Sequence, residues 1–356
     1  MADADCSTEF AERIRAAAPA RVPLCLRGSG SKDFLGHPSP GDALDLTAHA
    51  GIVRYAPDEL VLTARAGTRM AEIDAALAEH GQMLGFEPPH FGADATLGGT
   101  LAAGLSGPRR ASAGAARDFV LGTRILDGHG QSLRFGGEVM KNVAGYDVSR
   151  LMVGAFGTLG VILEASLKLV PKPRAQLGVR MQLDPASALD RLRSWAQRPL
   201  PISASAVVDG SLCVRLSGAS AAVRAAAEEL GGERFDDDAF WLSLREHTHA
   251  FFADPRPLWR LSIAPASVLA DLDGPVLIEW QGAQRWLKSD ASAARIRAAA
   301  SASGGHATRF RAGAAPAAVD HVFHPLPAPM LALHRRLKAE FDPHGLFNRG
   351  RIYPEL

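Results

Sequence analysis

Two glycine-rich segments in the amino-terminal half of the chain have a composition that suits the binding of phosphate groups. The first is Arg27-Gly28-Ser29-Gly30-Ser31-Lys32, and the second runs from Thr96 to Thr100 and continues to Gly104, Gly107 and Arg109. A turn rich in glycine and serine can direct several backbone N–H groups into one concavity, and the missing Cβ atoms let an anion approach closely. The two segments therefore predict two walls of one diphosphate site.

The familiar nucleotide-binding motifs do not fit the first segment. Asp33 stands where a Rossmann fingerprint needs its third glycine, and no acidic residue follows in the register that would bind a ribose. The segment also lacks the Gly-Lys-Ser or Gly-Lys-Thr element of a P-loop. A single turn of this kind often binds nothing, so the hypothesis of a nucleotide ligand rests on the occurrence of two such segments. If a nucleotide is bound, a fold other than the Rossmann or P-loop fold holds it.

Length and composition predict an ordinary globular protein with more than one domain. The 356 residues exceed what one hydrophobic core usually organises, and 47% of them are hydrophobic while 22% are charged. Thirty-nine basic and thirty-eight acidic residues leave a net charge of +1, which argues against nucleic acid as a partner. No apolar run approaches the roughly 18 residues that a transmembrane segment needs, so none is expected.

The cysteines and histidines predict neither a disulfide framework nor a metal site. Cys6, Cys25 and Cys213 are few, odd in number and far apart. Free thiols are typical of a reducing cytoplasm, and three are too few for an iron–sulfur cluster of the chain's own. The twelve histidines show no paired ligand spacing such as His-Glu-x-x-His, so no metal is expected.

The elements expected before residue 174 are those that would position the two glycine segments. The apolar run Val22–Leu26 predicts a strand that ends in the first segment. Thr68 is expected to cap a helix that buries Met70, Ile73 and Leu77. Further elements are predicted as helices over 1–20 and 141–152, and as strands over 60–64, 120–126, 132–135, 161–164 and 166–170.

Beyond Pro171-Lys172-Pro173, which marks a boundary because proline disrupts strand pairing and helix alike, the same order of elements is predicted twice. Each copy has the strand–helix–strand–strand–helix–strand order of a ferredoxin-like unit, so we expect one antiparallel sheet with helices on a face. The first copy comprises strands 178–183, 203–208, 211–216 and one near Arg234, with helices 186–197 and 219–230. The second comprises strands 258–263, 275–281, 284–288 and one near Phe310, with helices near Val268 and over 290–303.

The chain closes with a predicted helix that carries Met330, Leu333, Leu337 and Phe341 on one stripe and ends at Asp342-Pro343. Such a stripe usually packs against the main body. We therefore expect domains over 1–174 and 175–315, with a helix and tail over 316–356 that dock back on the first domain.

Several motifs resemble the FAD-binding domain of the vanillyl-alcohol oxidase and p-cresol methylhydroxylase flavoproteins. They are the two glycine segments together with Gly145-Tyr146-Asp147 and Gly157-Thr158-Leu159-Gly160-Val161-Ile162. Longer stretches, above all Phe135–Asp147, are similar to the E-subunit family of bacterial glycolate oxidases. The resemblance implies an α+β fold, with a two-part FAD-binding domain of the p-cresol methylhydroxylase type and a C-terminal domain whose antiparallel sheet is made of duplicated ferredoxin-like units.

The resemblance also implies a cofactor and the residues that hold it. FAD should be bound non-covalently, because neither glycine segment offers a clear histidine for attachment. The guanidinium of Arg109 is suited to bidentate contact with phosphate or flavin. The implied cofactor-binding residues are Arg27, Gly28, Ser29, Gly30, Ser31, Lys32, Thr96, Leu97, Gly98, Gly99, Thr100, Gly104, Gly107, Arg109, Gly160, Val161 and Ile162.

The function that the resemblance implies is that of a flavin-binding subunit in a multisubunit glycolate oxidase, which converts the small 2-hydroxy acid glycolate to glyoxylate. A sister flavoprotein subunit and an iron–sulfur subunit would be its partners, in the cytoplasm or peripherally at the inner membrane through those partners. The chain lacks the Glu-His-Gly motif that larger relatives use for a base and a metal ligand, so its catalytic residues are unknown. His90, His321 and His324 are candidates to face a flavin, although a lone histidine is more often structural.

Two other functions stay open. One is a self-sufficient FAD-dependent 2-hydroxy-acid dehydrogenase, in which Tyr146, His324 and Arg260 are the polar groups to test. The other is a non-catalytic scaffold of the same fold. Trp280-Gln281-Gly282 and Arg285-Trp286 are candidates for a partner contact, since Trp and Arg are favoured at interfaces, and buried sheet positions explain these residues equally well.

Overall fold

The computed structural model describes residues 4–137, 145–267, 272–314 and 321–356, and the chain divides into two compact units. Unit 1 comprises Met1–Ser106, Ala115–Pro171 and Pro325–Leu356, and unit 2 comprises Gly107–Gly114 and Lys172–His324. Each unit is thus assembled from stretches that are separate in the sequence. The short segment Gly107–Gly114 is part of unit 2, although its neighbours on both sides belong to unit 1.

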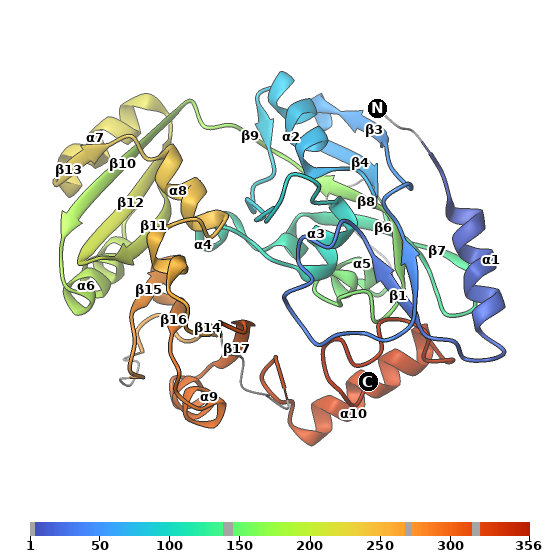
Figure 1. Cartoon of the computed structure of the whole chain (residues 1–356). Coiled ribbons are helices and arrows are strands. Elements are labelled where there is room, and N and C mark those ends of the chain that lie inside the picture. The colour runs from blue at the N-terminus through green and yellow to red at the C-terminus, as the bar shows by residue number, and fades with distance from the viewer. Residues whose placement is uncertain (1–3, 138–144, 268–271, 315–320) are drawn as a thin grey trace. The chain divides into compact units, whose positions relative to one another are not determined.

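Unit 1 is organised by a five-stranded antiparallel sheet in the order β3-β4-β8-β6-β7 (Figure 1). Strand β8 lies in the middle and is buried along nearly its whole length, including the polar residues Glu164 and Ser166 among its apolar ones. The strands predicted over 120–126 and 132–135 are β6 and β7, which form a hairpin with Ile125 paired to Leu133. The strands are β3 (Ile52–Ala56), β4 (Val61–Arg65), β6 (Val120–Leu126), β7 (Ser132–Gly136) and β8 (Val161–Lys168).

Two small sheets and several helices complete unit 1. The strand that leads into the first glycine segment, β1, pairs in parallel with β2, and β5 pairs with β9. Helix α1 packs Phe10 and Ile14 into a buried cluster that also contains Leu24 of β1, Val161 of β8 and Phe347 of the tail. The remaining elements are β1 (Leu24–Arg27), β2 (Asp42–Asp45), β5 (Gln82–Met83), β9 (Val170–Pro171), α1 (Ser7–Ala17), α2 (Met70–Glu79), α3 (Leu97–Ala103), α5 (Val148–Met152), α10 (Ala328–Phe341) and the 3-10 turns η1 (Pro57–Glu59) and η2 (Ala116–Asp118).

Helix α2 buries the predicted residues Met70, Ile73 and Leu77, but the prediction that Thr68 caps it is wrong. The Thr68 hydroxyl is buried and accepts a hydrogen bond from the Gly51 N–H while donating to the Gly51 carbonyl. The first turn of α2 bonds instead to the residue that precedes the second glycine segment, because the Met70 N–H donates to the Ala95 carbonyl at 2.7 Å. A helix cap can be predicted from neighbouring residues, but the bond between Thr68 and Gly51 joins residues seventeen positions apart and cannot be predicted in this way.

Unit 2 contains one eight-stranded sheet in the order β13-β10-β12-β11-β15-β16-β14-β17. All its neighbouring strands are antiparallel, and the two predicted copies meet where β11 pairs with β15. The predicted continuous sheet of two ferredoxin-like units is therefore confirmed. The first copy is β10 (Ala175–Gln182), α6 (Pro185–Trp195), β11 (Ile202–Val208), β12 (Ser211–Gly218), α7 (Ser220–Leu230) and β13 (Glu233–Phe235). The second is β14 (Leu258–Ser262), β15 (Val276–Glu279), β16 (Gln284–Lys288), α9 (Ala293–Ala302) and β17 (His306–Arg311).

Two predicted helices fall partly or wholly outside the described residues. The one near Val268 lies in 268–271, and the one over 141–152 is described only from residue 145 on, where α5 occupies Val148–Met152. Other short elements of unit 2 lie outside the duplicated pattern. They are α4 (Arg110–Ala113), α8 (Asp238–Arg245), η3 (Ala250–Ala253) and η4 (Trp280–Gly282).

The two faces of the unit 2 sheet differ in character, because side chains alternate along a strand. On one face apolar residues of the strands pack with α6, α7 and α9, for example Val214 with Val223 and Leu261 with Ile296. The alternate positions on the other face include charged and polar residues such as Arg260 of β14.

The predicted stripe of α10 is only partly covered, since Leu337 and Phe341 are half-buried but the other two residues are exposed. Met330 and Leu333 are 44% and 39% exposed, and none of the fourteen residues of the helix is buried. At its carboxyl end the helix packs Phe341 against Phe135, with ring centres 6.4 Å apart, and Lys338 adds polar contacts. Apolar spacing defines a face of a helix, but tertiary structure decides whether another element covers that face.

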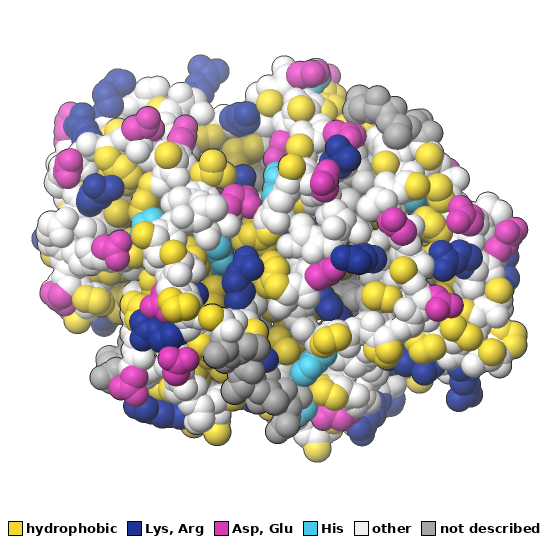
Figure 2. Space-filling view, viewed as in Figure 1, with side chains coloured by type: hydrophobic (Ala, Val, Ile, Leu, Met, Phe, Trp, Pro, Cys, Tyr) yellow, Lys and Arg dark blue, Asp and Glu magenta, His cyan; other side chains and the backbone are white. Residues whose placement is uncertain are grey.

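Acidic and basic side chains are interspersed over the face seen in Figure 2, in keeping with the net charge of +1. Among the helices within the described ranges, none is long and apolar enough to cross a membrane.

Candidate cofactor site

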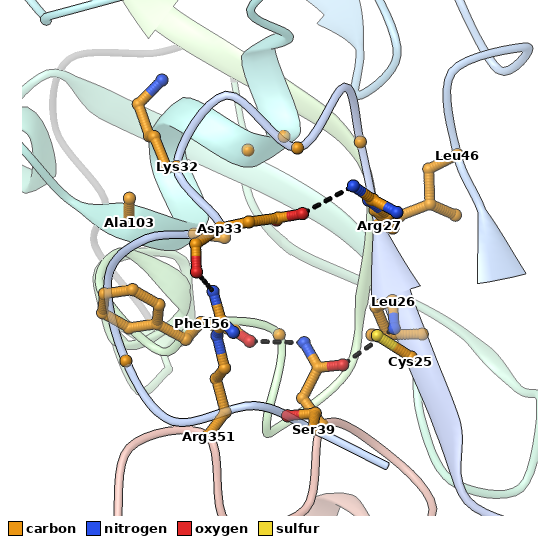
Figure 3. A pocket seen from close by; sticks show the side chains of 18 of the residues that line it. Cys25, Leu26, Arg27, Lys32, Asp33, Ser39, Leu46, Ala103, Phe156 and Arg351 are labelled. Atoms are coloured by element: carbon orange, nitrogen blue, oxygen red, sulfur yellow. Dashed lines mark hydrogen bonds and ion pairs between the residues drawn. The ribbon is translucent and has the colours of Figure 1, made fainter. Parts of the chain in front are cut away.

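A cavity of about 540 Å³ opens in unit 1 beside the first glycine segment (Figure 3). Its volume falls within the range of roughly 300–1,000 Å³ typical of small-molecule and cofactor sites. Four stretches far apart in the sequence line most of it. They are residues 25–39, the amino-terminal part of α3, the segment Phe156–Ile162 before and within β8, and the tail residues Asn348 and Arg351.

The first glycine segment presents backbone donors to this cavity. Among the residues that the structure describes, none accepts a hydrogen bond from the N–H groups of Gly28, Ser29, Gly30 and Ser31. Partly buried N–H groups are rarely left without a partner. Successive N–H groups in such a turn form a concavity that binds anions, so this wall fits the oxygens of a phosphate group.

The two glycine segments are in direct contact, and glycine is required for that contact. A Cβ on Gly28 would lie 2.5 Å from Oγ1 of Thr96. Thr96 cannot turn away freely, because its hydroxyl caps α3 by accepting from the Gly99 N–H. Gly30 has a φ of +79°, a conformation that favours glycine. The sequence prediction of two adjoining walls corresponds to this geometry.

The charges around the cavity are already partly paired. Arg27 and Asp33 form an ion pair of 2.7 Å between exposed side chains. The Lys32 side chain is buried and its ammonium donates to the His90 carbonyl and to Ser31 Oγ, at 3.1 and 3.3 Å. Figure 3 shows Lys32 directed away from the Arg27–Asp33 pair. Lys32 therefore stabilises the loop of the first glycine segment, in addition to any contact with a ligand.

The carboxy-terminal tail supplies a wall that the sequence did not indicate. Asn348 is buried, and its side chain accepts from the Leu26 N–H at 2.8 Å and donates to the Phe156 carbonyl at 2.6 Å. It thereby joins β1 to the segment that precedes β8. Arg351 donates to the carbonyls of His37 and Asp33, and burial lowers the pKa of its guanidinium.

The cavity brings together most, but not all, of the predicted cofactor-binding residues. Those that line it are Arg27, Gly28, Ser29, Gly30, Ser31, Lys32, Thr96, Gly98, Gly99, Gly160 and Ile162. Those that do not are Leu97, Thr100, Gly104, Val161, Gly107 and Arg109. Leu97 and Thr100 are buried within α3, Val161 is buried in β8, and Gly107 and Arg109 belong to unit 2.

Sequence reasoning missed several lining residues, of which Asn348 and Arg351 are the most informative. They follow the last helix in Asn348-Arg349-Gly350-Arg351, a polar stretch with a glycine that resembles an ordinary helix-ending turn. Asparagine and arginine are residue types that could line a polar cavity. The sequence could not show that this stretch lies beside β1, because β1 comes more than three hundred residues earlier; in the structure the Leu24 N–H donates to the Leu346 carbonyl.

The fold and the cavity define a flavoprotein: the family described as FAD binding domain matches residues 3–136. Over all 356 residues the chain is 50% identical to the glycolate oxidase subunit GlcE of Escherichia coli (strain K12), with 100% of both chains covered. The chain belongs to the GlcE family of glycolate oxidase subunits.

Two further comparisons describe the extent of the likeness. Over 158 residues the chain is 37% identical to the glycolate oxidase subunit GlcD of Bacillus subtilis (strain 168), covering 44% of this chain and 33% of that one. A solved structure of alkyldihydroxyacetonephosphate synthase has a TM-score of 0.64 at 16% identity, covering 96% of this chain and 74% of that chain. This last likeness shows the fold.

These findings confirm the predicted family, the fold class and FAD as the cofactor. The residues fit that cofactor, since the free N–H groups of the first glycine segment match the oxygens of its diphosphate. The residues considered for a partner contact are buried. Trp280, Arg285 and Trp286 are at most 4% exposed, so positions in the interior of unit 2 explain them.

Replacing Asn348 is expected to weaken FAD binding. Asn348→Ala removes the two side-chain hydrogen bonds that join Leu26 of β1 to Phe156, and losing each bond at these partly buried groups costs about 1–3 kcal/mol. Asn348 also has a φ of +40°, which alanine tolerates poorly. Asn348→Gly separates the two effects, because it restores the backbone freedom but not the hydrogen bonds. Flavin fluorescence titration should show an FAD dissociation constant at least about tenfold higher for both variants; a wild-type value for Asn348→Gly would contradict the bridging role.

Proposed function

We propose that this chain is the flavin-binding subunit of a multisubunit glycolate oxidase, an FAD-dependent oxidoreductase that converts glycolate to glyoxylate. The observation that carries the proposal is the full-length similarity to a protein of that name, joined to a cavity whose backbone donors fit a dinucleotide. Bound FAD would accept the electron pair that leaves the hydroxy acid. The chain's own residues bind and orient the cofactor.

The proposed arrangement assigns a role to each wall of the cavity. The N–H groups of residues 28–31 hold the diphosphate, and Thr96, through its contact with Gly28, keeps the second segment against the first. Gly160 and Ile162 present the backbone at the start of β8, and Asn348 holds β1 and the Phe156 segment at a set separation. With no histidine in either glycine segment, we propose that FAD is held non-covalently.

The proposed partners are a sister flavoprotein of the GlcD kind and an iron–sulfur subunit. The name of the full-length relative supports a multisubunit enzyme. The three cysteines are too few to ligate a [4Fe–4S] cluster, so electrons leaving the flavin need an acceptor on another chain. The described cysteines are all unpaired, which supports a reducing location such as the cytoplasm, with any attachment to the inner membrane made through the partners.

The proposal is tested by purifying the full chain alone and together with the two candidate partners. We expect the chain alone to carry FAD that acid precipitation releases into the supernatant, and to show no dye reduction with glycolate. Glycolate-dependent dye reduction should appear with the partners present. Turnover by the chain alone would instead make it a self-sufficient dehydrogenase. A colourless chain that cannot be loaded with FAD would make it a scaffold.

A further inference from the structure

A group of basic side chains lies on the face of the unit 2 sheet opposite α9. Trp259 and Leu261 of β14 pack with Ile296 of that helix, so Arg260 between them points to the other face. Across the sheet Arg260 is paired with Trp286 of β16 and with Thr308 of β17. The strand position therefore places a charged group on the second strand from one edge of the sheet, with a neighbouring strand on each side.

Buried polar groups orient the Arg260 side chain. Glu279 accepts hydrogen bonds from Trp286 Nε1 at 2.6 Å and from Gln284 Nε2 at 3.0 Å, and Gln284 Oε1 in turn accepts from Arg260 Nε at 2.9 Å. Glu279 and Gln284 are 4% and 2% exposed, so this chain of contacts is fixed by its surroundings. Within the described part of the protein, no residue accepts a hydrogen bond from the two terminal nitrogens of Arg260.

A second arginine adds positive charge at the same place. The guanidinium carbons of Arg110 and Arg260 lie 4.5 and 5.3 Å from the centre of the Trp280 ring, which is itself buried. Burial, and then the charge of Arg110, lower the pKa of Arg260 to about 10. Two cations held against one indole repel each other, and an anion between them would remove that cost.

Two histidines extend the cluster. His306 lies on β17, and its ring centre is 6.5 Å from that of His324. Burial lowers the pKa of both rings, and the charge of Arg260 lowers that of His306 further. At neutral pH the two rings are therefore uncharged.

We propose that this cluster, formed by Arg110, Arg260, Glu279, Gln284 and His306, binds the carboxylate of a small organic monoanion. The terminal nitrogens of Arg260 form a planar fork that matches the two oxygens of a carboxylate, and the Glu279–Gln284 chain holds the fork in place before binding. A monoanion brings one negative charge to this site, whereas a phosphate dianion would bring two beside the buried carboxylate of Glu279. The inference rests on the proposed function, because a 2-hydroxy acid is such an anion, and it makes this subunit one that contacts substrate.

The test is isothermal titration of glycolate, and separately of inorganic phosphate, into the FAD-loaded full chain at constant ionic strength. Arg260→Lys keeps the charge and removes the fork, and we expect it to weaken glycolate binding by about tenfold or more. Arg224→Lys is the matched control, since Arg224 is exposed on α7 in the same unit, and it should bind glycolate like the wild type. Gln284→Met removes the oxygen that orients Arg260 but changes no charge, and it should also weaken glycolate binding. It replaces Arg260→Lys as the test variant if Arg260→Lys does not fold.

Three results would overturn the inference. They are no glycolate binding by the wild type, unchanged binding in Arg260→Lys, and phosphate binding as tightly as glycolate. FAD is counted in the same samples. A chain that holds FAD but no glycolate contradicts this inference alone, whereas a chain that cannot hold FAD contradicts the proposed function.

Discussion

Gly28→Ala should raise the dissociation constant of FAD by about 10- to 100-fold. The new Cβ would lie 2.5 Å from Oγ1 of Thr96, a separation that real Cβ atoms essentially never show. Thr96 caps α3, so relief requires one glycine segment to move away from the other. Forcing an extra carbon into a closely packed contact typically costs about 1–3 kcal/mol, and each 1.4 kcal/mol is about a factor of ten in affinity. The measurement is flavin fluorescence titration of the apoprotein.

Two further variants make this prediction specific. Gly137→Ala is the matched control, because a Cβ there meets no atom within 4 Å, and it should bind FAD like the wild type. The double variant Gly28→Ala with Thr96→Ala removes the atom that clashes, so it should recover part of the lost affinity. If the double variant binds FAD no more tightly than Gly28→Ala, the steric explanation fails.

Lys338→Met should lower the free energy of unfolding by about 3–5 kcal/mol, the usual cost of breaking a buried ion pair by removing one partner. The Lys338 ammonium donates to the Thr158 and Phe347 carbonyls and to the Asp342 carboxylate, at 2.6, 2.8 and 2.6 Å. The Asp342 side chain has no solvent exposure. Burial lowers the pKa of Lys338, and the charge of Asp342 opposes that shift. Without the ammonium, the buried carboxylate keeps its bonds from the N–H groups of Leu346 and Phe347 but loses its counter-charge.

Urea-induced unfolding followed by circular dichroism measures this loss. Arg336→Met is the matched control, since Arg336 is an exposed cation on the same helix, and it should change stability by no more than about 0.5 kcal/mol. Equal effects of the two substitutions would show that the ammonium of Lys338 does not stabilise the tail. FAD retention should fall in Lys338→Met as well, because Phe347 directly precedes Asn348 in the wall of the cavity.

The local elements of unit 2 were predictable because their signals are local. Leu212, Val214 and Leu216 occupy alternate positions of β12 and are all buried on one face, and this period of two identifies a strand from its own residues. The order of such elements then indicated two ferredoxin-like units and one sheet, as observed. Helix α8 was not predicted, since it lies outside the repeated pattern on which that reasoning depended.

The residues that line the cavity of unit 1 were predictable only in part. Gly28, Gly30, Thr96 and Gly98 were identified from composition, because glycine and serine clusters have few structural explanations when two occur together. Asn348 could not be identified in this way. Its function depends on Leu26 and Phe156, which are 322 and 192 residues away in the sequence.

The amino-acid sequence by itself determined the family, the glycine segments and the strand and helix periodicities, since each depends on residues close together along the chain. Tertiary structure decided the rest: that Thr68 bonds to Gly51 and caps no helix, that Met330 and Leu333 stay exposed, and that Arg260 meets Arg110 at one indole. The physical reason is that hydrogen bonds, burial and charge pairing act over a few ångströms in space, and the distance between two residues in space is set by packing, which no local pattern reports.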